Sequence, residues 1–329
     1  MSTIVGLDAG CAYIKTAQFD GKGGIIEKSV LSLAKLGKST IGMGSGTGIT
    51  YLCDGEEWSI NPDRMNSEDT RFPTYPYSIL NTVLSYHALI EAGFTGKDKV
   101  HLSSGLPLDH FFDGADIDDN RISDKIQQFN RRSVEIRGGG DVPKARIENV
   151  YPEALSGWLD ISLDNDGNDT EQQTRPVGLV DIGGRTTDIA VVLPGFQIDP
   201  DFTSTINRGY LDVCGKLNEY LIREHDCGTI ETSVLDDALR TKEIQLVRGE
   251  MTDISEHCEN AIGYVSGEIM REAERKLSRA SHLVGTCYFG GGVEHMREQL
   301  SRGKSTFIPD RPQFSNARGY LKAMTFFTE

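Results

Sequence analysis

Two short stretches of the sequence carry an aspartate and a glycine at the same spacing, each directly after an apolar run. The first stretch is IVGLDAGCAYIK, with Asp8 and Gly10, and the second is GLVDIGGRTTDIAVV, with Asp181 and Gly183. Glycine lets the backbone turn tightly, so that several N–H groups point into one hollow that can bind phosphate oxygens. An aspartate beside such a hollow needs a cation, and Mg²⁺ with its shell of waters suits this task. The two turns therefore predict a phosphate and Mg²⁺ site.

A third glycine-rich segment, FGGGVEHM at 289–296, follows another strand-like run. Three glycines between a strand and a helix let a flat ligand, such as an adenine ring or a ribose, approach the backbone closely. Such turns are common, but this one gains weight from its place after the second Asp-x-Gly turn. The alternative is that the repeated turns are ordinary glycine hairpins, and their doubling disfavours it.

The elements that must position these turns are strands and helices in mixed order. Strands are predicted at residues 4–7, 13–19, 100–104 and 145–150, and on both sides of the second turn. Hairpins are predicted over 23–60, with an Asp-Gly turn at 54–55. Helices are predicted at residues 76–92, 120–133, 209–223 and 252–280, and in the final NARGYLKAM segment. Because β-hairpins open each half, the pattern predicts an α/β fold with mixed sheets.

The composition limits the size and the partners of the molecule. A chain of 329 residues favours two domains over one, and 38% hydrophobic with 25% charged residues is ordinary for a globular protein. The formal charge of −15, without clustered Lys and Arg, argues against a broad DNA-binding surface. The sequence has no signal peptide and no apolar run of transmembrane length. Its six cysteines form no CxxC pair, which favours reduced thiols in a cytosol.

The segment YPEALSGWLDISL is predicted to begin a helix, with Pro152 in its first turn. Glu153 near this helix start has two interpretations. It could orient a water in line with a terminal phosphate, or it could simply complement the helix macrodipole, and the residues alone favour the second. Residues 160–176, which are acidic and nearly without apolar side chains, are predicted to form a solvated loop at the seam between the two halves.

The order of these segments resembles the superfamily of actin, sugar kinases and heat-shock chaperone ATPases. SGLPLDHFFD, YPEALSGW, VDIGGRTTDIAVV, YFGGGVEHM and NARGYL further resemble the plasmid-segregation actin-like ParM proteins, the StbA family, over nearly the whole chain. The resemblance implies an actin-like α/β fold of two related domains, each with a mixed, five-stranded type of sheet flanked by helices, and a nucleotide cleft between them. It places domain I at 1–165, with a smaller subdomain at about 25–90 and a return of 316–329, and domain II at 166–315, with a smaller subdomain at about 210–265.

The resemblance also implies which residues form the site. Its implied nucleotide-binding residues are Asp8, Gly10, Cys11, Ala12, Lys15, Gly183, Gly184, Arg185, Thr186, Thr187, Gly209, Gly290, Gly291 and Gly292. Glu153, which would help to place the attacking water, and Asp181 are the implied catalytic residues, and Asp8 and Asp181 would hold Mg²⁺ through water. Relatives often have Ser or Thr and Asn where this chain has Cys11, Ala12 and Tyr13. The first turn therefore lacks hydroxyls there and relies on its backbone N–H groups.

The function implied by the resemblance is an ATPase, with ATP or GTP and Mg²⁺ as cofactors, that polymerises head to tail in the bacterial cytoplasm. Such filaments separate plasmid copies through an adaptor protein bound to centromere-like DNA, and hydrolysis weakens the filament. Direct DNA binding and membrane attachment are not expected. The alternative is a small-molecule, sugar-type kinase on the same fold, for which many acidic residues could supply the base. A chaperone is disfavoured because no residues are left for a peptide-binding domain.

Overall fold

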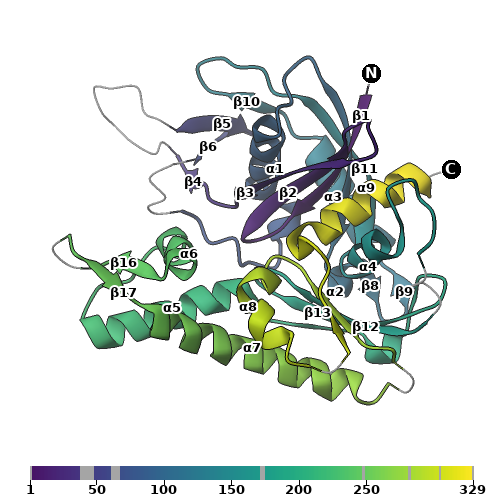
Figure 1. The fold of residues 1–329 in the computed structure, drawn as a ribbon. Helices are drawn as coiled ribbons and strands as arrows, with labels where there is room; N and C mark the ends of the chain where they lie inside the picture. Colours follow the sequence, from purple (N-terminus) through teal and green to yellow (C-terminus); the bar gives the residue numbers. More distant parts are fainter. Residues whose placement is uncertain are drawn as a thin grey trace.

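The computed structural model describes residues 2–37, 48–60, 67–170, 175–246, 249–280, 283–303 and 305–327. The elements of its first half are β1 (Ser2–Ala9), β2 (Tyr13–Phe19), β3 (Ile25–Leu31), β4 (Lys35–Leu36), β5 (Ile49–Cys53), β6 (Glu56–Ile60), η1 (Tyr75–Tyr77), α1 (Ile79–Glu91), β7 (Lys99–Leu106), α2 (Leu108–Phe111), β8 (Phe112–Asp113), β9 (Asp116–Ile117), α3 (Asp119–Asn130), β10 (Val134–Ile136), β11 (Lys144–Pro152) and α4 (Leu155–Ser162). Most of these strands join a five-stranded sheet in the order β11-β7-β1-β2-β3 or a four-stranded sheet in the order β10-β5-β6-β4 (Figure 1).

The second half repeats the arrangement at the centre of the first. Its elements are β12 (Val177–Ile182), β13 (Thr187–Leu193), β14 (Gln197–Ile198), η3 (Pro200–Phe202), β15 (Ser204–Ile206), α5 (Tyr210–His225), α6 (Thr232–Thr241), β16 (Glu243–Gln245), β17 (Met251–Asp253), α7 (Ser255–Leu277), β18 (Thr286–Phe289), α8 (Val293–Leu300), β19 (Thr306–Phe307), η4 (Pro312–Phe314) and α9 (Ser315–Phe326). The hairpin β12–β13 has β18 parallel to β12, as the hairpin β1–β2 has β7 parallel to β1. The predicted α/β fold with mixed sheets is confirmed.

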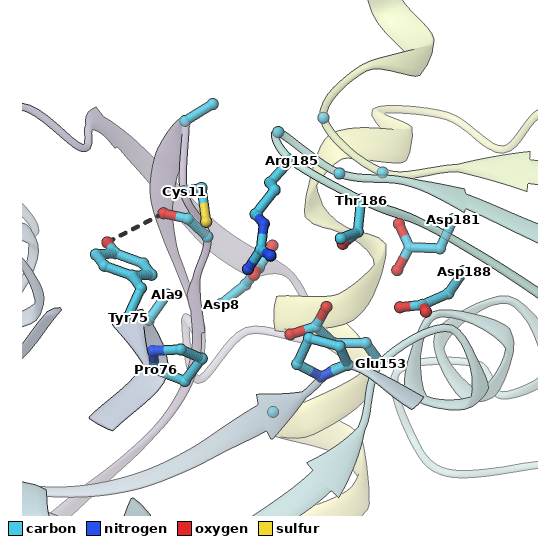
Figure 2. A pocket seen from close by; sticks show the side chains of 18 of the residues that line it. Asp8, Ala9, Cys11, Tyr75, Pro76, Glu153, Asp181, Arg185, Thr186 and Asp188 are labelled. Carbon is cyan, nitrogen blue, oxygen red and sulfur yellow. Dashed lines mark hydrogen bonds between the residues drawn. The ribbon is translucent and has the colours of Figure 1, made fainter. Parts of the chain in front are cut away.

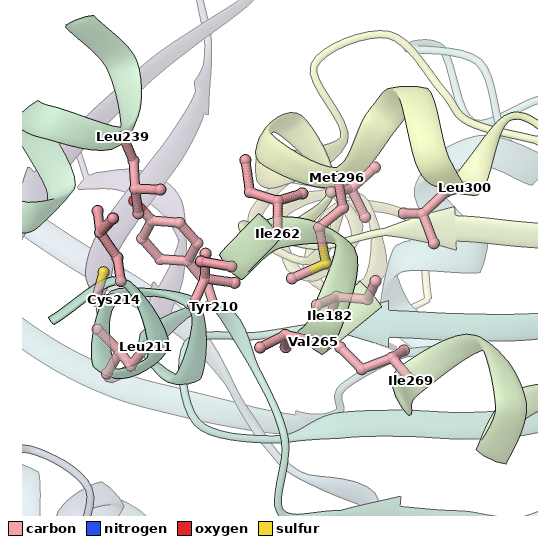
Figure 3. Packing of buried hydrophobic residues seen from close by; sticks show 14 of the residues in the cluster. Ile182, Tyr210, Leu211, Cys214, Leu239, Ile262, Val265, Ile269, Met296 and Leu300 are labelled. Atoms are coloured by element: carbon pink, nitrogen blue, oxygen red, sulfur yellow. The ribbon is translucent and has the colours of Figure 1, made fainter. Parts of the chain in front are cut away.

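Long helices cover the sheet of the second half. Helices α5 and α7 pack against each other in the lower part of Figure 1, and α8 packs on α7. The helix predicted at 252–280 is confirmed as α7, and it buries Cys258, Val265 and Ile269 on one face, with Ile254 buried just before its start. Figure 3 shows Val265 and Ile269 meeting Ile182 of β12 in this core. Among the described helices, none combines the length and the apolarity needed to cross a membrane.

The C-terminal helix α9 returns to the first half and packs on β1 and α4. Two glycines allow this close approach, since a Cβ on Gly6 would lie 1.9 Å from the Ala317 carbonyl oxygen and one on Gly319 would lie 1.8 Å from the Ser156 carbonyl oxygen. Helix α4 also contributes Trp158 to a buried cluster with β12, β13 and β18 of the second half. Helix α4 is therefore packed against both halves of the molecule.

The segment around α4 differs from its prediction in two ways. Pro152 does not begin the helix but ends β11, where it pairs with Leu106, and the N–H of Glu153 extends this ladder with a 2.8 Å bond to the Leu106 carbonyl oxygen. Asp160 was predicted in a solvated loop, yet it is buried in α4, where Lys322 and Arg318 donate to its carboxylate at 2.8 and 2.7 Å. Residues 171–174 of the predicted loop lie outside the described residues.

Candidate nucleotide-binding site

A cleft lies where β1, β12 and β18 end, between the two halves (Figure 2). The predicted site residues that line it are Asp8, Gly10, Cys11, Ala12, Lys15, Glu153, Asp181, Gly183, Gly184, Arg185, Thr186, Gly290 and Gly291. Three other predicted residues, Thr187, Gly209 and Gly292, lie behind its walls and do not line it. The cleft therefore brings together residues from both Asp-x-Gly turns and from the triple-glycine segment.

The first turn, Gly10–Ala12, has its carbonyl groups turned away from the cleft. The Gly10 carbonyl oxygen accepts from the Ser32 hydroxyl at 2.7 Å, and the Cys11 carbonyl oxygen accepts from the Thr70 hydroxyl at 2.6 Å. Within the described part of the chain, the N–H groups of this turn have no backbone acceptor. They are the donors that a bound phosphate would use. Burial raises the pKa of the Cys11 thiol to about 12, so it adds no negative charge here.

The second turn, Gly183–Thr186, rests on the start of helix α5. The N–H groups of Tyr210 and Leu211 donate to the carbonyl oxygens of Gly183 and Gly184 at 2.9 and 2.8 Å. Gly209 permits this contact, because a Cβ there would lie 2.6 Å from the Gly184 carbonyl oxygen. The structure thus places Gly209 as a support behind the turn. In the same way, Thr187 donates to the Arg208 carbonyl oxygen at 2.8 Å.

The two turns touch each other across the cleft. A Cβ on Gly184 would lie 2.8 Å from both the backbone nitrogen and the Cβ of Ala12. Any larger side chain at Gly184 would push the turns apart. The third segment packs against the same site. Gly290 adopts a φ of +95°, and a Cβ there would lie 2.3 Å from an Asp181 carboxylate oxygen. Gly292 lies outside the cleft and donates to the Ile182 carbonyl oxygen at 2.8 Å.

Three carboxylates meet on one side of the cleft. Glu153, Asp181 and Asp188 each offer an oxygen, and these oxygens lie within 4.8 Å of one another (Figure 2). Asp181 accepts from the Asn316 amide at 2.6 Å, and Asp188 accepts from the Thr205 hydroxyl. Of the two predicted metal-binding residues, Asp181 belongs to this group, whereas Asp8 accepts a 2.8 Å hydrogen bond from Lys15.

A strained elbow in the backbone aims Glu153 into the cleft. Ala154 has φ 61° and ψ −56°, and the N–H of Leu155 donates to the Glu153 carbonyl oxygen at 2.6 Å, which makes a γ-turn. Alanine rarely adopts this conformation, and such strain costs about 1–3 kcal/mol and gathers at functional sites. The N–H of Ala154 also donates to Asp181 at 3.3 Å. The elbow therefore links the two predicted catalytic residues.

Burial and mutual repulsion favour the protonated forms of these carboxyl groups. Burial raises the pKa of Asp181 to about 6 and that of Asp188 to about 8. Burial also raises the pKa of Glu153 well above its usual range, and the charges of Asp8, Asp188 and Asp181 add to this rise. A divalent cation would relieve the repulsion, and carboxylate oxygens are the ligands that Mg²⁺ prefers. The residues present therefore fit an Mg²⁺ ion.

Two family models match most of the chain. The model of the N-terminal part of plasmid segregation protein ParM matches residues 5–162, and the model of the C-terminal part of archaeal MreB-like actin homologues matches residues 179–302. The first half of the chain is therefore similar to plasmid segregation protein ParM, and the second half is similar to archaeal actin homologues. No curated protein matches this actin-like chain in sequence.

Solved structures share the fold of this actin-like protein. An archaeal actin homologue has a TM-score of 0.76 at 20% identity, covering 98% of this chain and 99% of its own. ParM in a 15-stranded filament from Clostridium botulinum has a TM-score of 0.72 at 18% identity, covering 98% of each chain. Bacillus thuringiensis ParM with AMPPNP has a TM-score of 0.67 at 13% identity, again covering 98% of each chain. The predicted actin-like fold is confirmed.

Several residues that line the cleft were not predicted from the sequence of this actin-like protein, among them Asp188, Lys125 and Asn316. The sequence contains a signal for Asp188, because it is the one acidic residue in the otherwise apolar end of VDIGGRTTDIAVV. Lys125 lies three residues after Ile122 and four before Phe129, which is helical spacing for an inner face. Asn316 stands at the head of NARGYL, a segment used for the resemblance without a role for its amide.

A hydrogen-bonded carboxylate joins the two halves of this actin-like protein beside the first turn. Tyr13 of β2 and Tyr210 of α5 both donate to Asp236 of α6, at 2.6 and 2.7 Å. Asp236 is only 3% exposed, so each hydroxyl is a main partner of a buried charge. Only the bond from Tyr13 crosses from the first half to the second. Tyr13 therefore ties the first turn to helix α6.

We expect Tyr13→Phe to lower the free energy of unfolding by about 1.5–3 kcal/mol, the usual range for a hydrogen bond to a charged group. Tyr210→Phe is the matched control, because it removes a hydroxyl from the same carboxylate within one half. Only Tyr13→Phe should also increase the radius of gyration in small-angle scattering, with stability measured by denaturant unfolding. Equal effects of both variants on the radius would contradict this role.

The pKa of Asp188 predicts how stability depends on pH. Its pKa is raised to about 8 in the folded state, above about 3.9 in the unfolded chain, so the folded state binds the extra proton between these values. The contribution of Asp188 to stability is therefore present at low pH and is lost as the pH rises toward 8. Without ligands, Asp188→Asn should flatten the fall in unfolding free energy between pH 5 and pH 8.5, as urea titrations would measure. An unchanged slope would show that Asp188 is ionised throughout.

Proposed function

We propose that this protein is an ATPase that binds Mg-ATP between its two halves and assembles into filaments. The observation that carries the proposal is the contact of Gly184 with Ala12, which brings two glycine turns from different halves together beside three carboxylates. A polyphosphate held by N–H groups of both turns would link the halves, so its presence would favour one arrangement of them. The solved archaeal homologue with ADP and the B. thuringiensis ParM with AMPPNP and with ADP support a nucleotide as the ligand.

Each proposed residue has a task that follows from its position. The turns at Gly10–Ala12 and Gly183–Thr186 would bind phosphate oxygens through N–H groups, and Gly290 and Gly291 would lie against the nucleoside. Asp8, Asp181 and Asp188 are the carboxylates that would hold Mg²⁺ directly or through water. Bound there, Mg²⁺ neutralises phosphate charge and orients the phosphates.

Glu153 is proposed to position the attacking water. Phosphoryl transfer to water depends mainly on placing the water in line with the terminal phosphate. The elbow at Ala154 fixes the direction of the Glu153 side chain, and burial together with the carboxyl groups around it raises its pKa. A carboxylate with a raised pKa accepts a proton more readily than an ordinary glutamate does.

The finer proposal is segregation of plasmid DNA in a bacterial cytoplasm. The family model of plasmid segregation protein ParM supports this role, and the ParM filament of C. botulinum supports self-association, which we propose to be head to tail. ATP would favour assembly, and hydrolysis would weaken the filament. With a net charge of −15, this chain would reach DNA through an adaptor protein that binds the plasmid.

The test is to mix the purified protein with Mg-ATP or Mg-GTP and to follow light scattering, pelleting and phosphate release together. Scattering and pelleting that rise with nucleotide and fall as phosphate is released would support the proposal. Phosphate transfer that requires an added sugar, without scattering, would instead support the small-molecule kinase and overturn the filament function.

A further inference from the structure

Lys125 is a buried cation without a partner that faces the nucleotide cleft. It lies on the inner face of α3, beside Phe129, and is only 3% exposed. Among the residues that the structure describes, it makes no ion pair and no hydrogen bond. It nevertheless lines the cleft. Its helix packs on β11, the strand that leads into the elbow of Glu153.

Two other buried lysines among the described residues show that an unpaired buried lysine is unusual here. Lys322 is equally buried, and its ammonium donates to Asp160 and to the Leu163 carbonyl oxygen, each at 2.8 Å. Lys15 donates to Asp8 at 2.8 Å. Buried charges are normally paired in this way because removal from water is costly. In the free protein, therefore, no pairing interaction offsets the free-energy cost of burying Lys125.

The groups around Lys125 show where a bound anion would pair with its ammonium group. Burial lowers the pKa of Lys125 to about 8, and the negative charge of Glu153 is the largest influence opposing this fall, followed by that of Asp8. Lys125 thus lies at the end of the cleft that contains Glu153, which is the residue proposed to place the water that attacks the terminal phosphate. An anion with several oxygens in that position would pair with the ammonium group.

Arg185 approaches the same region from the opposite wall. Figure 2 shows its side chain extending from the second turn toward Asp8 and Glu153. In the described part of the chain, Arg185 has no ion pair or hydrogen bond. The two unpaired cations of the cleft therefore come from different halves, one on α3 and one on the β12–β13 turn.

We propose that Lys125 and Arg185 form a two-sided clamp for the terminal phosphate, with Lys125 as the positioning residue that lets the cleft distinguish a triphosphate from a diphosphate. The proposal rests on the proposed nucleotide function. The terminal phosphate of the triphosphate pairs with both cations and draws the two halves together. A diphosphate leaves both cations unpaired, so the halves separate more easily after hydrolysis.

The test compares Lys125→Met with the wild type for binding of a non-hydrolysable triphosphate analogue and of ADP, both with Mg²⁺, by calorimetry. Methionine keeps the length and apolar contacts of the lysine stem. We expect affinity for the triphosphate analogue to fall about tenfold or more, as for a lost charge-assisted hydrogen bond, and affinity for ADP to change by less than about twofold. Arg185→Met should show the same selective loss. Arg131→Met, an exposed position at the end of α3 with the same change of charge, is the control and should bind both nucleotides as the wild type does.

A second measurement separates this role from a structural one. Without nucleotide, Lys125→Met should unfold at the same temperature as the wild type or higher, because it removes an unpaired buried charge. Lower stability together with an equal loss of both nucleotides would overturn the proposal, and so would unchanged binding of the triphosphate. If the wild type binds neither nucleotide, the proposed function itself fails. If the wild type binds both nucleotides and Lys125→Met weakens both equally or neither, only the clamp fails.

Discussion

Glu153→Gln is expected to slow the release of phosphate from ATP by roughly a hundredfold or more, while nucleotide binding and filament assembly persist. Glutamine keeps the size of the side chain and the elbow at Ala154, but it cannot accept a proton from the attacking water. Phosphate release under single-turnover conditions measures the chemical step, and pelleting measures assembly. Filaments of the variant should therefore last longer than those of the wild type.

The matched control for this prediction is Glu148→Gln. Glu148 lies on β11, the strand that leads to Glu153, and the substitution removes the same charge, but its side chain is on the surface, where it pairs with His101 at 2.9 Å. It should hydrolyse ATP at the wild-type rate. Loss of ATP binding in Glu153→Gln would show that Glu153 serves mainly to hold the nucleotide, and an unchanged rate would exclude it from positioning the water.

Asp8→Asn is expected to weaken the binding of Mg-ATP by about 10- to 100-fold, which is typical for loss of a group that holds a metal through water or supports its ligands. Asp8 ends β1 beside the first turn, and its carboxylate faces the cleft together with Lys15. Calorimetry with Mg²⁺ and with a chelator separates the two contributions of Asp8. The loss should be large when Mg²⁺ is present and small when it is removed.

Two further measurements make the Asp8 result interpretable. Asparagine leaves the buried Lys15 ammonium without its carboxylate, so thermal unfolding must show that the variant is folded at the temperature of the titration. Asp113→Asn, an exposed carboxylate at the end of β8, should bind Mg-ATP normally. Equal losses with and without Mg²⁺ would mean that Asp8 acts through Lys15 and the phosphate, and not through the metal.

Local patterns in the sequence were sufficient to predict the turns of this site. Asp8, Gly10, Asp181 and Gly183 line one cleft, and each pair was predictable because an apolar run followed by Asp-x-Gly is a local signal for a strand that ends in a tight turn. The apolar spacing in 252–280 likewise predicted α7, since a helix that buries one face repeats its apolar residues every three or four positions. Such features depend on neighbours in the sequence, so the sequence alone is enough to predict them.

The features that sequence reasoning missed depend on neighbours in space. Pro152 suits the first turn of a helix, but it is equally tolerated at the end of an edge strand, and β11 is the edge of its sheet. Lys125 and Asp160 look like solvated charges in a polar helix and an acidic loop, because nothing nearby in the sequence shows that α3 covers the cleft or that α9 supplies Lys322 and Arg318. Helix α6, which holds Asp236, was not predicted at all.

The first turn has no hydroxyl of its own at Cys11 or Ala12, yet hydroxyl groups hold its backbone in place. They come from Ser32, Thr70 and Tyr75, which donate to the carbonyl oxygens of Gly10 and Cys11. Mutations in the turn itself should therefore be tolerated better than mutations in the residues that support it. Positions 11 and 12 can accept other small side chains, whereas loss of a supporting hydroxyl some 20 to 65 residues away would free a carbonyl to rotate toward the phosphates. Variation in nucleotide affinity among relatives of this chain should thus track residues that never touch the nucleotide.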